Sequence, residues 1–175
     1  MKYFPSLTLL LFTLMLFANK SYCQTDISDT LSKRFTRFIG EWRLKDNVWR
    51  SKLGGESKDS TRSFVAKAAS PENSIIWSAD FGGGGWAVLF WTYHKETGKL
   101  NHISNTTDNN VGIGTGEFNA DNDLIIKIVY PNGCTTCHRI YTYHWISSNE
   151  FDFKATIYKD GELTDDFYGA TFLRK

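Results

Sequence analysis

Ten short segments of strand character follow one another after Gly40, each bounded by turn residues. No segment between them is long and helical enough to cross between parallel strands, so successive strands are expected to pair antiparallel as hairpins. About ten strands in one short chain form either a closed barrel or a sandwich. The expected strands are residues 41–50, 62–69, 74–81, 86–94, 99–105, 111–118, 123–130, 138–147, 150–159 and 165–174.

The alternation of apolar and polar residues favours the barrel. Phe151 and Phe153 share one face of their strand, whereas Asp152 and Lys154 lie on the other. Strand 86–94 is apolar on both faces, so its outer side is expected to be covered by an N-terminal helix or by a second subunit of a homodimer. We therefore predict an all-β fold, an antiparallel up-and-down β-barrel of about ten strands with a short N-terminal helix.

One amphipathic helix is predicted in front of the barrel. Its apolar side chains recur at helical spacing, at Ile27, Leu31, Phe35 and Phe38. Asp26 or Ser28 is expected to cap its N-terminus, and Gly40 ends it. A helix of this kind typically packs on a sheet as a plug or a lid.

Residues 1–23 have the layout of a secretory signal peptide. Lys2 precedes the apolar run 7–17, the segment contains no acidic residue, and Cys23 is a small residue suited to cleavage after it. A membrane span needs about 20 apolar residues, so this shorter run predicts no span. We expect an exported protein, periplasmic or extracellular, with a single domain at residues 24–175.

Removal of this segment changes what the composition implies. The remaining domain has 18 basic and 19 acidic residues, a formal charge of −1, so nucleic-acid binding has no electrostatic basis. Met1 and Met15 are lost with the segment, which leaves no methionine to ligate a haem iron. Cys134 and Cys137 remain, in a compartment where thiols are normally oxidised.

Cys134, Cys137 and His138 form a C-x-x-C-H motif, the pattern of covalent c-type haem attachment. The motif follows a Pro-Asn-Gly turn and enters a strand, whereas haem attachment usually lies on a helix. We therefore predict a disulfide between Cys134 and Cys137 and no cofactor, with haem c or a redox-active dithiol as alternatives. No metal site is predicted, because His138 and His144 lie about 20 Å apart on an unbroken strand.

The two ends of the domain resemble the lipocalin, or calycin, pattern. Gly40 and Trp42 follow the helix with the Gly-x-Trp spacing found at the start of the first barrel strand, and Arg174 matches the terminal cation that stacks on this tryptophan. The hairpins at 91–99 and 148–154 are similar to those of small secreted bacterial lipocalin-like proteins of uncharacterised function. The resemblance covers most of the domain and implies a barrel floor closed by Gly40, Trp42 and Arg174.

Candidate ligand contacts are the residues expected to face the barrel interior. Strand 138–147 has two suitable faces: if the face with Ile140 points inward, His144 lies inside, and the opposite parity would place Tyr141 and Tyr143 there. An inward histidine serves either as a ligand contact or as a hydrogen-bonded structural residue. The predicted ligand-binding residues are Trp77, Phe90, His102 and His144.

The sequence contains no recognised catalytic motif and no carboxylate pair on one inward face. We predict a non-enzymatic, exported, lipocalin-like barrel that binds a small, mostly apolar molecule entering from the side of residues 82–85. The alternative function is a haem-binding or thiol-redox protein that uses the C-x-x-C-H motif. A third class, an interaction module, would have a filled interior and an apolar outer patch around residues 86–93.

Overall fold

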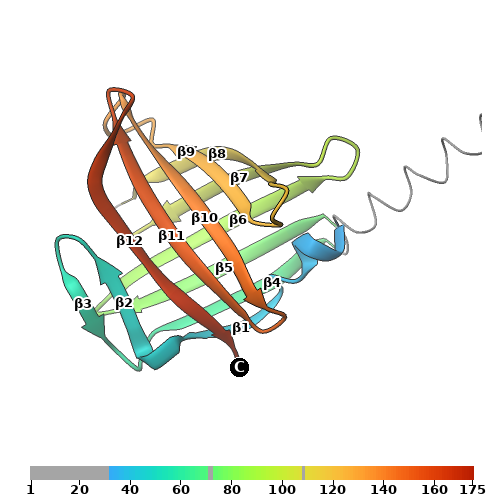
Figure 1. The fold of residues 1–175 in the computed structure, drawn as a ribbon, viewed down its shortest axis with the longest axis horizontal. Coiled ribbons are helices and arrows are strands. Elements are labelled where there is room, and N and C mark those ends of the chain that lie inside the picture. The colour runs from blue at the N-terminus through green and yellow to red at the C-terminus, as the bar shows by residue number, and fades with distance from the viewer. Residues whose placement is uncertain (1–31, 71–72, 108) are drawn as a thin grey trace, which may run out of the picture.

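The computed structural model describes residues 32–70, 73–107 and 109–175, so the predicted signal peptide and the first part of the predicted helix lie outside the described residues. Residues 32–36 are helical, and residues Lys45–Asn47 form a 3-10 turn, η1. No helix in the described part of the chain is long and apolar enough to cross a membrane. The strands (Figure 1) are β1 (Gly40–Leu44), β2 (Val48–Ser51), β3 (Gly55–Lys58), β4 (Ser63–Ser70), β5 (Ser74–Gly82), β6 (Gly85–His94), β7 (Lys99–Thr106), β8 (Val111–Phe118), β9 (Leu124–Val129), β10 (Cys137–Ser147), β11 (Glu150–Lys159) and β12 (Glu162–Arg174).

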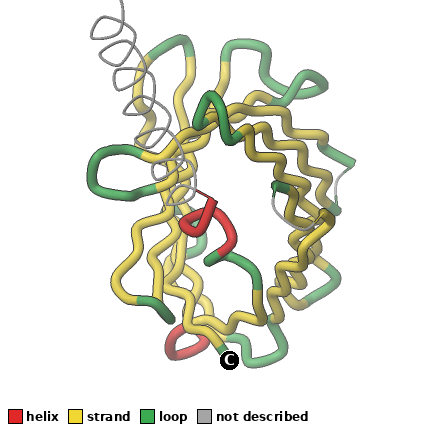
Figure 2. The backbone as a smooth tube through the Cα atoms, turned by 90° about the vertical axis from the view of Figure 1, so that its right-hand side faces the viewer, coloured by secondary structure: helices red, strands yellow, loops and turns green. Residues whose placement is uncertain are grey.

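The strands form one antiparallel sheet that closes on itself. β1 and β4 to β12 follow one another around a ten-stranded barrel, and the pairing of Trp42 with Arg174 joins β1 to β12. Figure 2 shows the ring of strands, with the helix across it. The predicted up-and-down barrel is therefore confirmed, because each strand from β4 to β11 pairs with the next one in the chain.

The predicted strand 41–50 is wrong as a single element. Asp46 and Asn47 have positive φ angles of 54° and 57°, which end β1 and loop out η1. The chain then returns to the same edge of β12, where Ser51 pairs with Tyr168. β2 and β3 consequently add a hairpin to the barrel that the alternation of residues did not predict.

The two ends of the barrel differ. We call the end with the turns after β5, β7, β9 and β11 the mouth, and the opposite end, which carries the helix, the plugged end. Phe35 and Phe38 are fully buried. The ring of Phe38 lies 5.3 Å from that of Trp91 and 5.6 Å from that of Phe151, centroid to centroid. The described part of the helix and the turn after it therefore fill the barrel end, and the expectation that the helix covers the outer face of β6 is wrong for these residues.

The floor residues lie together at the plugged end, as the resemblance implied. The Arg174 guanidinium carbon lies 4.3 Å from the ring centroid of Trp42, and its two Nη atoms donate to the carbonyls of Arg37 and Ile39 at 2.6 and 2.7 Å. Gly40 has a φ of +151°, and a Cβ there would collide with the Arg174 guanidinium. Glycine is therefore required at this position, because a side chain would displace the stacked cation.

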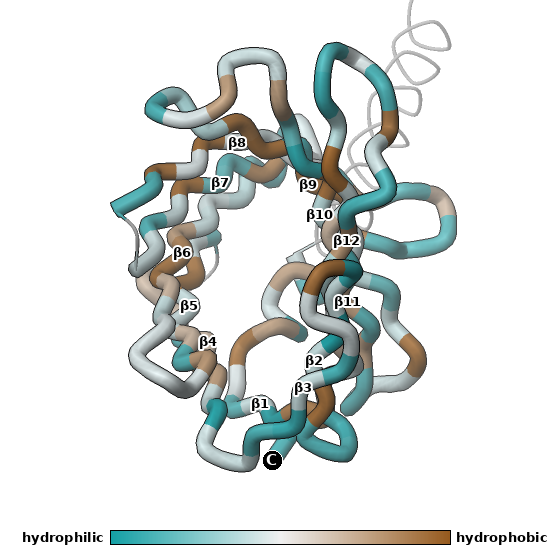
Figure 3. Tube along the Cα trace, turned by 90° about the vertical axis from the view of Figure 1, so that its left-hand side faces the viewer, coloured by the Kyte–Doolittle hydropathy of each residue, from teal (hydrophilic) through white to brown (hydrophobic). Residues whose placement is uncertain are grey.

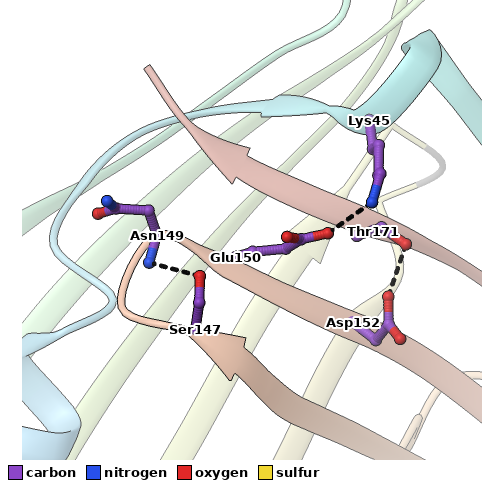
Figure 4. Close-up of polar contacts among 6 residues, drawn as sticks. All are labelled: Lys45, Ser147, Asn149, Glu150, Asp152 and Thr171. Atoms are coloured by element: carbon purple, nitrogen blue, oxygen red, sulfur yellow. Dashed lines mark hydrogen bonds and ion pairs between the residues drawn. The ribbon is translucent and has the colours of Figure 1, made fainter.

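On the outside, one polar contact fastens η1 to the barrel wall and another joins β11 to β12. Lys45 Nζ lies 2.9 Å from Glu150 Oε1, and Thr171 Oγ1 donates to Asp152 Oδ1 at 2.6 Å (Figure 4). Glu150 and Asp152 alternate with the buried Phe151 and Phe153, as the sequence pattern predicts. Pairs at a surface contribute little free energy, so the plugged end is stabilised mainly by its buried rings.

Candidate ligand-binding site

A cavity of about 420 Å³ lies inside the barrel between the plug and the mouth. Its volume falls within the range of about 300–1,000 Å³ that is typical of small-molecule sites. Twelve of the 21 residues that line it are aromatic, and its walls include Trp49, Phe64, Trp77, Trp86, Phe153 and Phe172. The interior is therefore hollow and mostly apolar. An interaction module that used the barrel only as a scaffold would have a filled interior.

Among the described residues, those that line the cavity include positively charged side chains but no negatively charged ones. Arg62 and Arg139 line it, whereas no aspartate or glutamate does among the described residues. Arg62 is hydrogen-bonded to neighbouring residues of the barrel wall: its Nε donates to the Phe81 carbonyl at 2.9 Å, and its Nη2 donates to Ser57 Oγ at 2.9 Å. Arg62 Nη1 also donates to the Ser57 carbonyl, whereas Arg139 uses only two of its five N–H donors, so Arg139 has the larger unused hydrogen-bonding capacity.

Arg139 lies within a cluster of three tyrosines. Its Nη1 donates to the hydroxyl oxygens of Tyr130 and Tyr168 at 3.1 and 3.2 Å. The hydroxyl of Tyr141 bridges the other two, at 3.0 Å from that of Tyr130 and 2.7 Å from that of Tyr168. The guanidinium carbon also lies 4.4 Å from the Tyr130 ring centroid, so the cation has a fixed position. We call these four residues the Arg–Tyr cluster.

Two small residues create the space for this cluster. Ala155 pairs with Tyr141 on one side and Tyr168 on the other, so the two hydroxyls meet above its methyl group. A Cβ at Gly112 would lie 3.1 Å from the ring of Tyr130. The glycines of β8 thus leave room for the side chains of neighbouring strands.

The tyrosines of the cluster are protonated at neutral pH. Burial raises the pKa of Tyr141 and of Tyr130 well above the usual value near 10, and the neighbouring Tyr168 and Tyr141 hydroxyls, respectively, add to this effect. Burial also raises the pKa of Tyr168. Each hydroxyl therefore keeps a proton to donate.

Trp77 is the predicted ligand contact that the structure places in the cavity wall. It is 6% exposed, and its ring lies 5.6 Å from that of Trp91. Its indole Nε1 is buried with no hydrogen-bond partner among the described residues. A buried donor of this kind needs an acceptor from a guest molecule or water.

His102 is inside the barrel, as predicted, but is not among the residues that line the cavity. Its Nδ1 accepts a hydrogen bond from Trp91 Nε1 at 2.8 Å, which leaves the proton of a neutral ring on Nε2. Burial lowers its pKa to about 4. His102 therefore takes the structural role, holding Trp91 against the plug.

Phe90 points outward, so the prediction that it lines the cavity with Trp77 is wrong. The β5–β6 hairpin contains a β-bulge at Phe81, between the pairs Gly82–Gly85 and Asp80–Trp86. Without the bulge Trp77 would pair with Phe90, but the extra residue pairs it with Leu89 instead. A one-residue shift moves every side chain to the opposite face.

His144 is also on the outer face, for the same reason. A bulge at Ile146 separates the pair Ser147–Glu150 from the pair Trp145–Phe151, which places the odd-numbered residues of β10 inside. His144 is exposed, and its Nδ1 lies 2.7 Å from Asp123 Oδ1. The alternative parity, with Tyr141 and Tyr143 inside, is the correct one.

An apolar row crosses the outer surface from β5 to β9. Its members pair directly with one another from strand to strand and are between 37% and 51% exposed. Figure 3 shows apolar segments on the neighbouring strands β6, β7 and β8. The outer apolar row consists of Ile76, Phe90, Ile103, Ile113 and Val129.

Cys134 and Cys137 form a disulfide in the loop at the mouth. Because the two sulfur atoms are bonded to each other, neither is available for covalent haem attachment in this structure. His138 lies at the start of β10 with its ring stacked on Tyr158, 4.7 Å between centroids. No group of three or more metal-ligating side chains occurs among residues 32–70, 73–107 and 109–175.

The residues of the Arg–Tyr cluster were not among the predicted ligand contacts. Their signal was the alternation of Arg139 and Tyr141 on one face of β10, opposite a small residue on β11. Choosing that face required the register of β10 against Phe151 and Phe153, which the bulge determines.

Comparison with solved structures finds designed β-barrels that are similar to this chain. EF1p2_mFAP2b, solved with DFHBI bound, has 16% sequence identity and a TM-score of 0.38, over 83% of this chain and 99% of that chain. A redesigned barrel bound to DFHBI, mFAP1, gives 13% and 0.36, over 80% and 96%. A de novo designed fluorescence-activating barrel gives 13% and 0.35, over 80% and 95%. No protein-family model and no curated protein matches the chain.

Proposed function

We propose that the protein is a binding protein that holds a small, mostly apolar molecule in its barrel cavity. The observation that carries this proposal is the hollow, aromatic-walled space of about 420 Å³ between the plug and the mouth. Burying apolar ligand surface contributes about 25 cal/mol per Å², and a few polar groups orient the guest. The predicted side of entry, near residues 82–85, lies at the mouth.

We also propose that this barrel is lipocalin-like, non-enzymatic and exported to a periplasm or the extracellular space. The stacked Arg174 and Trp42 at the floor support the lipocalin-like assignment. The signal-peptide pattern of residues 1–23 and a disulfide at the mouth support export, since disulfides persist in oxidising compartments. The mass of the mature chain isolated from its host tests the cleavage after Cys23, and its absorption spectrum tests the alternative of haem c.

Ala87→Phe should block binding. Ala87 is 6% exposed and lines the cavity, so a phenyl group at this position occupies space that a guest needs. We expect at least a tenfold loss of affinity, about 1.4 kcal/mol, for N-phenyl-1-naphthylamine, an uncharged apolar probe whose fluorescence rises on burial. The matched control is Val88→Phe, because Val88 is the next residue and lies on the outer face, 43% exposed.

Failure of the unsubstituted protein to bind the probe, or equal binding by Ala87→Phe and Val88→Phe, would contradict the proposed site. Thermal unfolding of both variants checks that the barrel remains folded. Displacement of the probe by a panel of lipids and terpenoids would then identify the class of guest.

The homodimer stays a prediction, and the outer apolar row is the surface that it concerns. Ile103 is its central residue and is 51% exposed. If two copies cover the row, Ile103→Lys should convert a dimer into a monomer in sedimentation velocity. A monomer at the same concentration before the substitution would show this prediction to be wrong.

A further inference from the structure

The Arg–Tyr cluster has more hydrogen-bond donors than acceptors. A guanidinium has five N–H donors, and Arg139 uses two of them, both on Nη1, for Tyr130 and Tyr168. The three tyrosine hydroxyls have three protons but share only two hydroxyl–hydroxyl hydrogen bonds. Three N–H groups and one O–H group therefore have no acceptor among the described residues.

The charge of Arg139 is also not neutralised within the cavity. No carboxylate of the described residues lies within ion-pair distance of it, and none lines the cavity. The tyrosines are neutral, because burial raises the pKa of Tyr141 and of Tyr130. A partly buried cation without a counter-charge is costly unless a partner supplies one.

We propose that the Arg–Tyr cluster binds the carboxylate of an amphipathic guest whose apolar chain lies along the aromatic wall. This inference rests on the proposed function and assigns the chemical class of its ligand. A carboxylate offers two acceptor oxygens in the planar arrangement that matches the guanidinium fork, and the spare tyrosine proton adds a third hydrogen bond. An uncharged alcohol could satisfy only part of this donor set.

The fold orients such a guest along the barrel axis. Arg139 is the third residue of β10, which begins at the mouth, whereas Tyr143 lies further along the same strand and contacts the plug. Trp77 and Phe151 also line the cavity and contact Phe38 of the plug. The headgroup therefore lies toward the mouth, and the apolar chain points toward the plug.

The experiment compares decanoate with 1-decanol, which have the same chain length and differ in the charge of the head. Affinities are measured by calorimetry and by displacement of N-phenyl-1-naphthylamine. Because its hydrogen bonds to the cluster are charge-assisted, decanoate should bind about tenfold to hundredfold more tightly than 1-decanol. Arg139→Met should abolish this advantage and leave the affinity for 1-decanol within about threefold.

Arg139→Lys and Arg43→Met complete the design. Lysine keeps the charge but not the fork, so it should retain only part of the preference for decanoate. Arg43 is an exposed residue of β1, so Arg43→Met should preserve the full preference while removing the same charge. Thermal unfolding of each variant reports whether it is folded.

The outcomes separate the two proposals. Equal affinity of the unsubstituted protein for decanoate and 1-decanol, or a preference that survives in Arg139→Met, would overturn the carboxylate assignment while the proposed binding function stands. Binding of none of the three compounds would overturn the proposed function, and the carboxylate assignment with it. The comparison of acid and alcohol needs no variant, so it decides the question even if Arg139→Met does not fold.

Discussion

Phe38→Ala should lower the free energy of unfolding by about 3–5 kcal/mol, the usual cost of removing a buried phenylalanine ring. Phe38 is fully buried, and its ring lies within 4.9 to 6.1 Å, between centroids, of five other aromatic rings. Alanine would leave a void between the helix and the barrel wall that these stiff rings cannot fill. Denaturant unfolding, followed by tryptophan fluorescence, measures the change.

Phe90→Ala is the matched control for this substitution. It removes the same side chain from β6, but Phe90 is 37% exposed on the outer apolar row, so we expect a loss of about 1 kcal/mol or less. Equal losses for the two variants would mean that the helix does not plug the barrel in solution. A loss confined to Phe38→Ala would establish the plug as the main source of stability at this end.

His102 should make the barrel less stable as the pH falls from about 6.5 to about 4. Burial lowers the pKa of His102 to about 4 in the folded protein, whereas the unfolded chain titrates near 6.5. Between these values the unfolded chain binds a proton that the folded chain does not, so the free energy of unfolding decreases as the pH falls. The total loss is roughly 3 kcal/mol, and the contribution is independent of pH above about 7.5.

His102→Gln tests this assignment, because glutamine can still accept the hydrogen bond from Trp91 but does not titrate. Carboxylates also titrate in this range, so the measured quantity is the difference between the two proteins at each pH. We expect the free energy of unfolding of the unsubstituted protein, minus that of His102→Gln, to decrease by roughly 3 kcal/mol between pH 7.5 and pH 4. His94→Gln, at an exposed position on β6, is the control. Parallel curves for the unsubstituted protein and His102→Gln would contradict the role of His102.

Most elements were predictable from the sequence because several hairpin turns contain residues with a positive φ angle. Gly83, Gly84, Gly98 and Gly161 all have positive φ angles, and they separate strands whose predicted limits differ from the observed ones by only a few residues. The Gly-x-Trp spacing and the terminal arginine likewise located the barrel floor. These features are local, so the order of residues is sufficient to reveal them.

The inward faces of two strands were not predictable, because each depends on a single extra residue. Phe81 and Ile146 form bulges near the ends of their hairpins, and nothing in their side chains distinguishes them from ordinary strand residues. The bulges turned Phe90 and His144 outward and Arg139 inward. The polar part of the candidate site was therefore missed for a geometric reason, although the presence of a cavity was expected.

The plug gives the barrel only one route for its guest among the described residues. Phe38 and its neighbouring rings occupy one end, so a molecule that enters at the mouth must leave by reversing its path. A barrel that binds a guest as proposed would therefore act as a carrier and not as a channel. Release would then be controlled at the mouth, where the disulfide and Trp86 lie. The dissociation rate of a bound guest should depend on those residues more than on the depth of the cavity.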